Sequence, residues 1–306
     1  MKPENQKLSI LEKIGYGSGD AAVNVVISSM FLIITFFYTD VYGLKATDMA
    51  LMFLLVRFID AVSDPLMGLI TDKYKFKSGR FRPYFLYLSV PFGISVFLTF
   101  TTPGFDYTGK LIYAYLTYIF VTLMFTSVTI PYISLIGVLT SDPKERLSAN
   151  GYRLFFAKVA AFLVSIVVPI LAEKLGKSDL SRGYQLAMGV MALLGTLLLI
   201  FCFYTTKERV EHVIDKKSLL EQFKLLLKNG QWTLLFGVCF TGTVGYVIRG
   251  SVAISLIMFL VVKPGDLILA YVLYFILSFV VDLHAPVFWS AIAEAVDYGH
   301  AESGKR

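Results

Sequence analysis

Residues 46–70 read ATDMALMFLLVRFIDAVSDPLMGLI, and this stretch decides the fold class. Apart from one polar cluster near its centre, the stretch is almost continuously apolar. A helix needs about 20 such residues to cross the hydrocarbon core of a bilayer. Because an open sheet edge is not viable in lipid, the stretch predicts a transmembrane helix.

The composition of the whole chain agrees with this interpretation. Of the 306 residues, 56% are apolar and only 16% are charged, whereas soluble domains are about 25% charged. Two soluble domains, a disordered chain and a disulfide scaffold are excluded, the last because only two cysteines occur. The net charge of +6 comes from basic residues that lie mainly between the apolar segments, as in membrane proteins, so we expect no nucleic-acid partner. We predict an all-α polytopic protein surrounded by the lipid bilayer.

Eight apolar segments are long enough to be spans, and the longest hydrophilic stretch, Lys207–Gln231, separates the sixth from the seventh. This layout predicts a six-helix bundle over 1–206, a basic cytoplasmic linker over 207–231 and an incomplete second bundle over 232–306. The predicted spans are Ile14–Tyr38, Ala46–Ile70, Tyr84–Thr101, Leu111–Leu139, Leu154–Leu171, Tyr184–Tyr204, Trp232–Val262 and Leu267–Val296.

The distribution of Lys and Arg predicts the orientation, since cytoplasmic loops carry an excess of positive charge. With the N-terminus inside, 18 of the 28 basic residues fall on the cytoplasmic side and six fall outside; the remaining four lie within spans. We therefore expect a multi-pass membrane protein with a cytoplasmic N-terminus.

The polar cluster of the second span is the first candidate site. Asp60 and Asp64 are four residues apart and share one helical face with Arg57, while Ser63 lies three residues after Asp60. Two carboxylates one turn apart repel each other unless a cation or a proton lies between them. Oxygen ligands suit a hard cation such as Na⁺, and a shared proton is the alternative. A purely structural Arg57–Asp60 ion pair, with Asp64 as a cap near the loop, also explains the pattern.

The first span carries a polar stripe at four-residue spacing, formed by Asp20, Asn24 and Ser28. The glycines that precede Asp20 allow a ligand or a neighbouring helix to approach the backbone. Asp20 is a candidate to bind the hydroxyl groups of a ligand. Alternatively, it pairs with a basic residue such as Arg153 of the fifth span.

The fourth span has a weaker stripe that includes Tyr118, Thr122, Thr126 and Thr129. Threonine hydroxyls in a membrane helix often bond to their own backbone or join neighbouring helices, so this stripe alone indicates little. Arg153 is a candidate to hold a sugar hydroxyl or to balance Asp20, and snorkelling to the surface is its structural alternative.

The loop between the second and third spans is punctuated by Gly68, Asp72, Gly79 and Arg80. An acidic residue among basic ones on the cytoplasmic side can latch two helices through ion pairs that break when the helices separate. Positive charge that only sets orientation is the alternative. The chain has no nucleophile elbow, zinc-protease motif or nucleotide loop, so we expect no enzyme and no cofactor apart from a coupling ion, Na⁺ or H⁺.

Several segments together resemble the glycoside–pentoside–hexuronide cation symporters, the family of the melibiose permease. This resemblance implies a fold of the major facilitator type, with two six-helix bundles. It implies cation ligation by Asp60, Ser63, Asp64 and Thr126, and sugar contact by Asp20 and Arg153. Thr129 replaces a sugar-binding Asp of the melibiose permease, so the sugar is left open. The matching segments are Glu12–Asp20, Phe37–Asp40, Arg57–Gly68, Gly79–Pro83, Ile130–Tyr132 and Asp297–Gly299.

The resemblance also implies that part of the family's second bundle is missing. The last predicted span resembles the tenth of the family's twelve helices, so helix eight, most or all of nine, and helices eleven and twelve have no counterpart. We expect an internal junction near Ala253–Leu256 and a C-terminal truncation. The expected function is cation-coupled sugar or glycoside symport. A transport-deficient remnant that still binds ligand, or a non-transporting sensor that acts through the linker, is the alternative.

Overall fold

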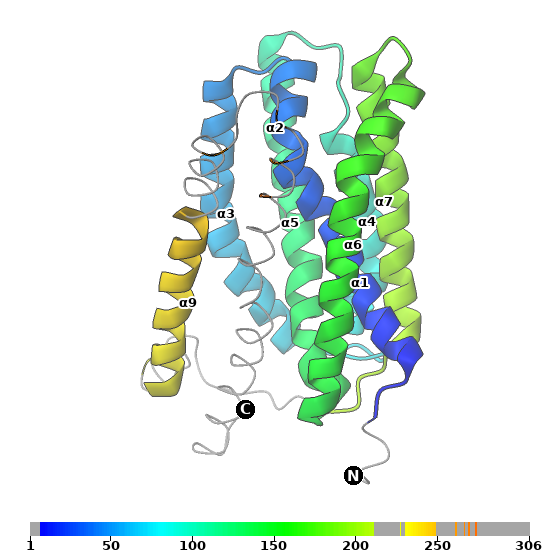
Figure 1. The fold of residues 1–306 in the computed structure, drawn as a ribbon, viewed down its shortest axis with the longest axis vertical. Coiled ribbons are helices and arrows are strands. Elements are labelled where there is room, and N and C mark those ends of the chain that lie inside the picture. The colour runs from blue at the N-terminus through cyan, green and yellow to red at the C-terminus, as the bar shows by residue number, and fades with distance from the viewer. Residues whose placement is uncertain are drawn as a thin grey trace. The chain divides into compact units, whose positions relative to one another are not determined.

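The computed structural model describes residues 7–210 and 230–248, together with the single positions 227, 261, 266, 269 and 273. These residues form helices and connecting turns, with one isolated β-bridge and no strand among them. The helices between residues 10 and 205 run along a common direction (Figure 1). In chain order the elements are α1 Ile10–Leu32, α2 Ile34–Phe36, the π-helix η2 Phe37–Val41, α3 Ala46–Lys73, α4 Arg82–Thr99, α5 Tyr107–Leu139, α6 Pro143–Gly176, α7 Leu180–Thr205 and α9 Gly230–Ile248.

Four helices begin earlier than the predicted apolar segments because polar capping residues start them. Ser9 caps α1 in a capping box with Glu12, and aspartates cap α5, α6 and α7. The carboxylate of Asp142, for example, accepts a hydrogen bond from the backbone N–H of Lys144. As a result, α6 begins at Pro143 and the predicted start at Leu154 was wrong.

The first predicted span is a bent pair of helices and not a single helix. The chain turns by 50° between α1 and the segment Ile34–Val41, which ends in the π-helix. Phe37 and Tyr38 of this π-helix are fully buried, and the Phe37 ring lies 4.9 Å from that of Phe100. Aromatic packing therefore fixes the bend, which the apolar pattern could not show.

Small residues set the close packing of the bundle. α1 packs on α6 and α7, α4 packs on α5 and α7, and α3 packs mainly on α5. A side chain at Gly183 would collide with the carbonyl of Ala172, and one at Gly17 would lie 2.7 Å from the Phe156 ring. Glycine at such positions lets helix backbones approach, as is usual in membrane bundles.

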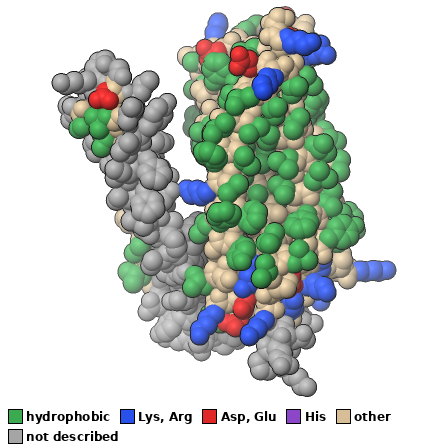
Figure 2. Space-filling model, turned by 45° about the vertical axis from the view of Figure 1, so that its right-hand side comes forward, with side chains coloured by type: hydrophobic (Ala, Val, Ile, Leu, Met, Phe, Trp, Pro, Cys, Tyr) green, Lys and Arg blue, Asp and Glu red, His purple; other side chains and the backbone are tan. Residues whose placement is uncertain are grey.

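Apolar side chains cover the flank of the bundle in Figure 2, and charged side chains gather mainly at its two ends. Among the described residues, α5, α6 and α7 are long and apolar enough to cross a membrane, and the bent pair α1–η2 makes a fourth. The charge-bearing α3 and the shorter α4 are not among them. This number concerns the described residues alone, and the eighth predicted span, Leu267–Val296, lies almost entirely outside them.

The chain divides into two compact units, Met1–Ile214 and Asp215–Arg306. The first unit contains the predicted six-helix bundle. It extends past the predicted boundary at residue 206 because the backbone N–H groups of Arg209 and Val210 donate to the Val138 carbonyl. Of the second unit the structure describes mainly α9, which covers part of the predicted span Trp232–Val262. The predicted junction Ala253–Leu256 and most of the predicted linker lie outside the described residues.

Candidate functional site

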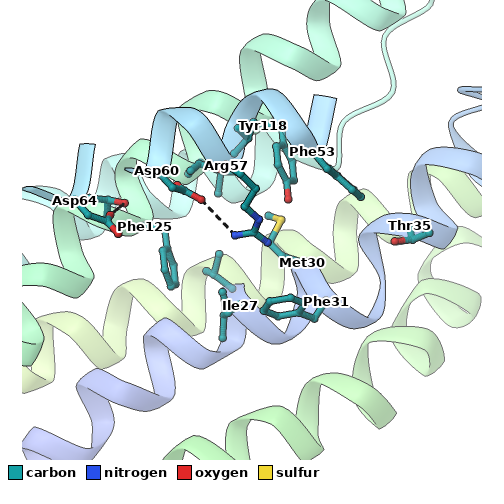
Figure 3. Close-up of a pocket in the computed structure, with 15 residues that line it drawn as sticks. Ile27, Met30, Phe31, Thr35, Phe53, Arg57, Asp60, Asp64, Tyr118 and Phe125 are labelled. Carbon is teal, nitrogen blue, oxygen red and sulfur yellow. Dashed lines mark hydrogen bonds and ion pairs between the residues drawn. The ribbon is translucent and has the colours of Figure 1, made fainter. Parts of the chain in front are cut away.

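A cavity of about 390 Å³ opens between the first span, α3 and α5 (Figure 3). Its lining combines two carboxylates and a guanidinium group with aromatic and aliphatic side chains, the mixture that is typical of small-molecule sites. The lining residues are Val26, Ile27, Met30, Phe31, Thr35, Phe53, Val56, Arg57, Asp60, Asp64, Tyr118, Val121, Thr122, Phe125 and Thr126.

The two carboxylates of the cavity have different partners. The Thr126 hydroxyl donates to Asp64 Oδ1 over 2.8 Å, which joins α5 to α3. Arg57 Nη1 lies 3.4 Å from Asp60 Oδ2, and the Arg57 side chain is 67% exposed while that of Asp60 is 23% exposed. The Arg57–Asp60 pair of the structural alternative is thus present. Asp64, however, lies within α3 and lines the cavity, so its interpretation as a cap near the loop was wrong.

Ser63 does not join this arrangement. Its hydroxyl donates to the Asp60 carbonyl of its own helix over 3.4 Å, and it is not among the residues that line the cavity. Of the four predicted cation ligands, the structure therefore brings together Asp60, Asp64 and Thr126. Among the described residues there is no group of three or more His, Cys, Asp or Glu side chains placed to hold a metal ion.

The apolar side of the cavity was missed by the sequence analysis. Ile27, Phe31 and Thr35 follow one another at four-residue spacing along the first span, and all three line the cavity. This spacing is visible in the sequence, but in an apolar helix it does not distinguish a cavity face from a lipid-facing one. On α5, Tyr118, Thr122 and Thr126 of the predicted stripe line the cavity, whereas Thr129 is not among its lining residues.

The predicted sugar ligands Asp20 and Arg153 form a separate, closed ion pair. Arg153 Nε lies 3.2 Å from Asp20 Oδ1, and the two side chains are 17% and 8% exposed respectively. The Arg153 guanidinium also lies 5.6 Å from the centroid of the buried Tyr132 ring, which is stacked on Tyr16. Neither Asp20 nor Arg153 is among the residues that line the cavity. The alternative in which Arg153 balances Asp20 is thus what the structure shows.

The other two predicted sugar ligands have different surroundings. The Asn24 amide donates to the Asp20 carbonyl of its own helix over 2.9 Å. The Thr129 hydroxyl oxygen is buried and makes no hydrogen bond among the described residues. No hydrogen bond within the described residues therefore accounts for the buried Thr129 hydroxyl.

The loop after α3 is held by Glu208, a residue that the sequence analysis overlooked. The Glu208 carboxylate accepts hydrogen bonds from the backbone N–H groups of Arg80, Phe81 and Arg82 at 2.8, 2.8 and 2.9 Å. The guanidinium of Arg80 donates to the Asp72 carbonyl over 2.7 Å. The only sign of Glu208 in the sequence was that it is an acidic residue within a basic stretch. Arg80 and Asp72 are thus joined through the Asp72 backbone carbonyl, so this contact is not the ion pair of the predicted latch, and Glu208 connects the loop to the end of α7.

Gly79 and Gly68 play different parts in this loop. Gly79 has a φ of +131°, and a Cβ there would lie 2.6 Å from the Glu208 carboxylate, so both conformation and space require glycine. At Gly68 a Cβ would meet nothing within 4 Å. The structure therefore gives a reason for one of the two predicted loop glycines.

An apolar helical bundle with a charged cavity midway along its helices defines a class, the multi-pass membrane transporters. Residues 15–254 and 250–306 match the family described as MFS/sugar transport protein. The chain belongs to this family, and the predicted resemblance is confirmed. The two matched segments meet at 250–254, next to the predicted junction.

Three relatives show how much of such a protein the chain covers. The putative glycoside/cation symporter YagG of Escherichia coli (strain K12) is 40% identical over 88% of this chain and 58% of its own length. The uncharacterized symporter YnaJ of Bacillus subtilis (strain 168) is 42% identical over 78% of this chain and 54% of its own length. The inner membrane symporter YicJ of Escherichia coli (strain K12) is 32% identical over 99% of this chain and 77% of its own length. The chain thus spans little more than half the length of the first two.

Proposed function

We propose that the chain performs the cation-binding and sugar-binding steps of a cation-coupled sugar or glycoside symporter of the bacterial inner membrane, with its N-terminus in the cytoplasm. The names of the relatives YagG and YicJ support symport, and the name of YagG supports a glycoside and a cation. The observation that carries the proposal is the Asp64–Thr126 hydrogen bond in a cavity that also contains Asp60.

In this mechanism Asp60, Asp64 and Thr126 supply the oxygen atoms that hold Na⁺, or the carboxylates share H⁺. Without a cation two ionised carboxylates at this spacing on α3 repel each other, and within the described part of the chain Arg57 is an ionic partner for Asp60 but not for Asp64. A bound cation removes the repulsion and fixes α3 against α5 through Thr126. Binding of the cation and of the sugar to one conformation raises the affinity for each by the same factor.

Asp20 and Arg153 are proposed as sugar contacts, together with Asn24 and Thr129. In the structure Asp20 and Arg153 satisfy each other, so sugar hydroxyls have to replace part of this ion pair. A carboxylate and a guanidinium are together an acceptor and a donor set for adjacent hydroxyl groups. The Thr129 hydroxyl makes no hydrogen bond among the described residues, so it is available as a further donor to the sugar or acceptor from it.

The test is uptake of radiolabelled glycosides into vesicles that contain the full chain, with and without an inward Na⁺ gradient or a pH gradient. One charge moved across 100 mV supplies about 2.3 kcal/mol, enough for roughly 50-fold accumulation. We expect Asp60→Asn to abolish accumulation against a gradient. Accumulation by Asp60→Asn equal to that of the unchanged protein would refute the coupling role. The matched control is Asp48→Asn, on the same helix but not among the cavity-lining residues.

A ligand-binding protein without transport is the second candidate, and one observation favours it. The alignment to YicJ extends over 357 residues, more than the 306 of this chain, so part of that relative has no counterpart within the aligned stretch. Loss of helices from the second bundle would remove the half needed for alternating access. Binding of a labelled glycoside to the purified chain, without uptake in vesicles, would favour this candidate.

A further inference from the structure

The segment Lys73–Lys77, at the end of α3, reads Lys-Tyr-Lys-Phe-Lys. All five residues are exposed, and the two aromatic side chains retain 54% (Tyr74) and 38% (Phe76) of their accessible surface. Alternating cationic and aromatic side chains at a helix end match the chemistry of a membrane interface, where aromatic rings lie at headgroup level and lysines face anionic lipids.

The positive charges of the Lys73–Lys77 segment are available to a ligand. Among the described residues, none of its three lysines forms an ion pair. Lys73 Nζ lies 5.8 Å from the centre of the neighbouring Tyr74 ring, a contact that leaves its charge in place. The segment is thus an unneutralised cationic surface.

The segment is also held in one conformation. Phe76 and Gly79 exchange two backbone hydrogen bonds, of 3.0 and 3.3 Å. The Phe76 ring packs 5.5 Å from that of Tyr84 and 5.8 Å from that of Tyr87, both on α4. Tyr87 is 61% exposed, so the aromatic contact continues from the turn onto the flank of the bundle.

Glu208 fixes the base of the same turn. Its three hydrogen bonds to backbone N–H groups follow Gly79 directly, and Gly79 leaves the space that the carboxylate occupies. Arg82 adds a second tie, because its guanidinium donates to the Phe203 carbonyl over 2.6 Å. A surface that is already ordered loses less conformational entropy when a ligand binds.

We infer that the Lys73–Lys77 segment is a preformed binding surface for the headgroups of anionic phospholipids in the leaflet that it faces. The three lysines attract the phosphate groups, while Phe76 and Tyr87 insert beside the acyl chains. Each lysine near an anionic surface strengthens binding about five-fold. This inference concerns lipid binding alone and does not depend on whether the chain transports sugar.

The test places one tryptophan next to the segment in the full chain. Trp232 and Trp289 are replaced by Phe, and Phe76→Trp becomes the reporter, with Tyr87→Trp as a second reporter in case Phe76→Trp disturbs folding. The protein is reconstituted in vesicles of phosphatidylglycerol and phosphatidylcholine in which one lipid at a time is dibrominated. We expect dibrominated phosphatidylglycerol to quench more strongly than dibrominated phosphatidylcholine. At 1 M salt, where the Debye length is about 3 Å, the preference should fall toward one.

Two charge variants decide between a local surface and diffuse positive charge. Lys73→Gln/Lys75→Gln/Lys77→Gln should bring the quenching ratio close to one. The matched control Lys7→Gln/Lys144→Gln/Lys207→Gln removes three other exposed lysines and should leave the ratio nearly unchanged. Equal quenching by both lipids in the parent reporter protein, or an equal loss in both triple variants, would overturn the inference.

Discussion

Two of the acid–base pairs among the described residues lie along the length of the bundle and away from its ends, and they differ in how far they are closed to solvent. Asp20 and Arg153 are both nearly buried and lie beside the stacked rings of Tyr16 and Tyr132. Arg57 and Asp60 lie at the edge of a cavity, and most of the Arg57 side chain is exposed. A closed pair is costly to break because the charge that remains stays buried without a partner. An open pair can exchange its partner for a ligand at small cost, and this is the difference that the following predictions test.

The largest effect is expected from breaking the closed pair. Asp20→Asn leaves a buried guanidinium without its counter-charge, which typically costs about 3–5 kcal/mol. Asp60→Asn removes the partner of a largely exposed arginine and should cost no more than about 1 kcal/mol. Thermal unfolding of both purified variants in detergent measures the difference. Equal losses of stability would contradict the distinction between closed and open pairs.

The packing around the two pairs should show the same contrast. A Cβ at Gly19 would lie 2.6 Å from the Tyr132 ring and 3.0 Å from Cys202 Sγ, so Gly19→Ala should destabilise by about 1–3 kcal/mol. A Cβ at Gly68, on α3 beside the open pair, would have no neighbouring atom within 4 Å. Gly68→Ala should be neutral or stabilise by up to about 1 kcal/mol through helix propensity. The same unfolding measurement applies, and destabilisation by Gly68→Ala would argue that α3 is closely covered at this point.

Within the open region, the Asp64–Thr126 hydrogen bond should matter for cation binding more than for stability. Thr126→Val removes a hydrogen bond worth about 1 kcal/mol and should raise the Na⁺ concentration needed for thermal protection about five-fold. Thr122→Val, which alters the same cavity lining one turn earlier, is the matched control. If both variants shift the Na⁺ dependence equally, the specific role of Thr126 is disproved.

The smallest effect on stability is expected for Arg57→Gln, because its ion pair is mostly solvated and such pairs contribute at most about 1 kcal/mol. Its effect on Na⁺ should have the opposite sign to that of Thr126→Val. Without Arg57, no guanidinium from that position competes with Na⁺ for the Asp60 carboxylate, so thermal protection should begin at a lower Na⁺ concentration. Unchanged or weaker protection would show that Arg57 does not compete for Asp60.

The sequence was sufficient to predict most of the helices, since a long apolar run in a chain with few charges has few alternatives. It predicted the start of α3 at Ala46 but not the starts of the capped helices, because capping residues such as Asp142 lie outside the apolar runs. It also did not predict the bend before η2, which depends on the packing of Phe37 against Phe100, a residue distant in the chain.

For the site, local spacing was informative and long-range pairing was not. Asp60 and Asp64 share a helical face by their spacing alone, and the resemblance supplied Thr126. Whether Asp20 faces a ligand or Arg153 depends on two helices whose contact residues are 133 positions apart. Glu208 was missed for a similar reason, because it binds backbone N–H groups more than 120 residues away, and these leave no mark in a side-chain pattern.

The π-helix at the end of the first span has a consequence for the register of the whole molecule. A π turn closes its hydrogen bond over one residue more than an α turn does, so η2 accommodates one extra residue between α1 and the corner at Tyr42, whose hydroxyl donates to the Lys110 carbonyl. Removing one residue within 37–41 would let this segment close as an ordinary α turn, so the preceding helix would keep its phase relative to the corner. A deletion within α1 has no such turn to absorb it, and it would rotate the residues before it by about 100° relative to those after it. The π-helix is therefore the place in the first span where a change of length leaves both the cavity and the Asp20–Arg153 pair in register.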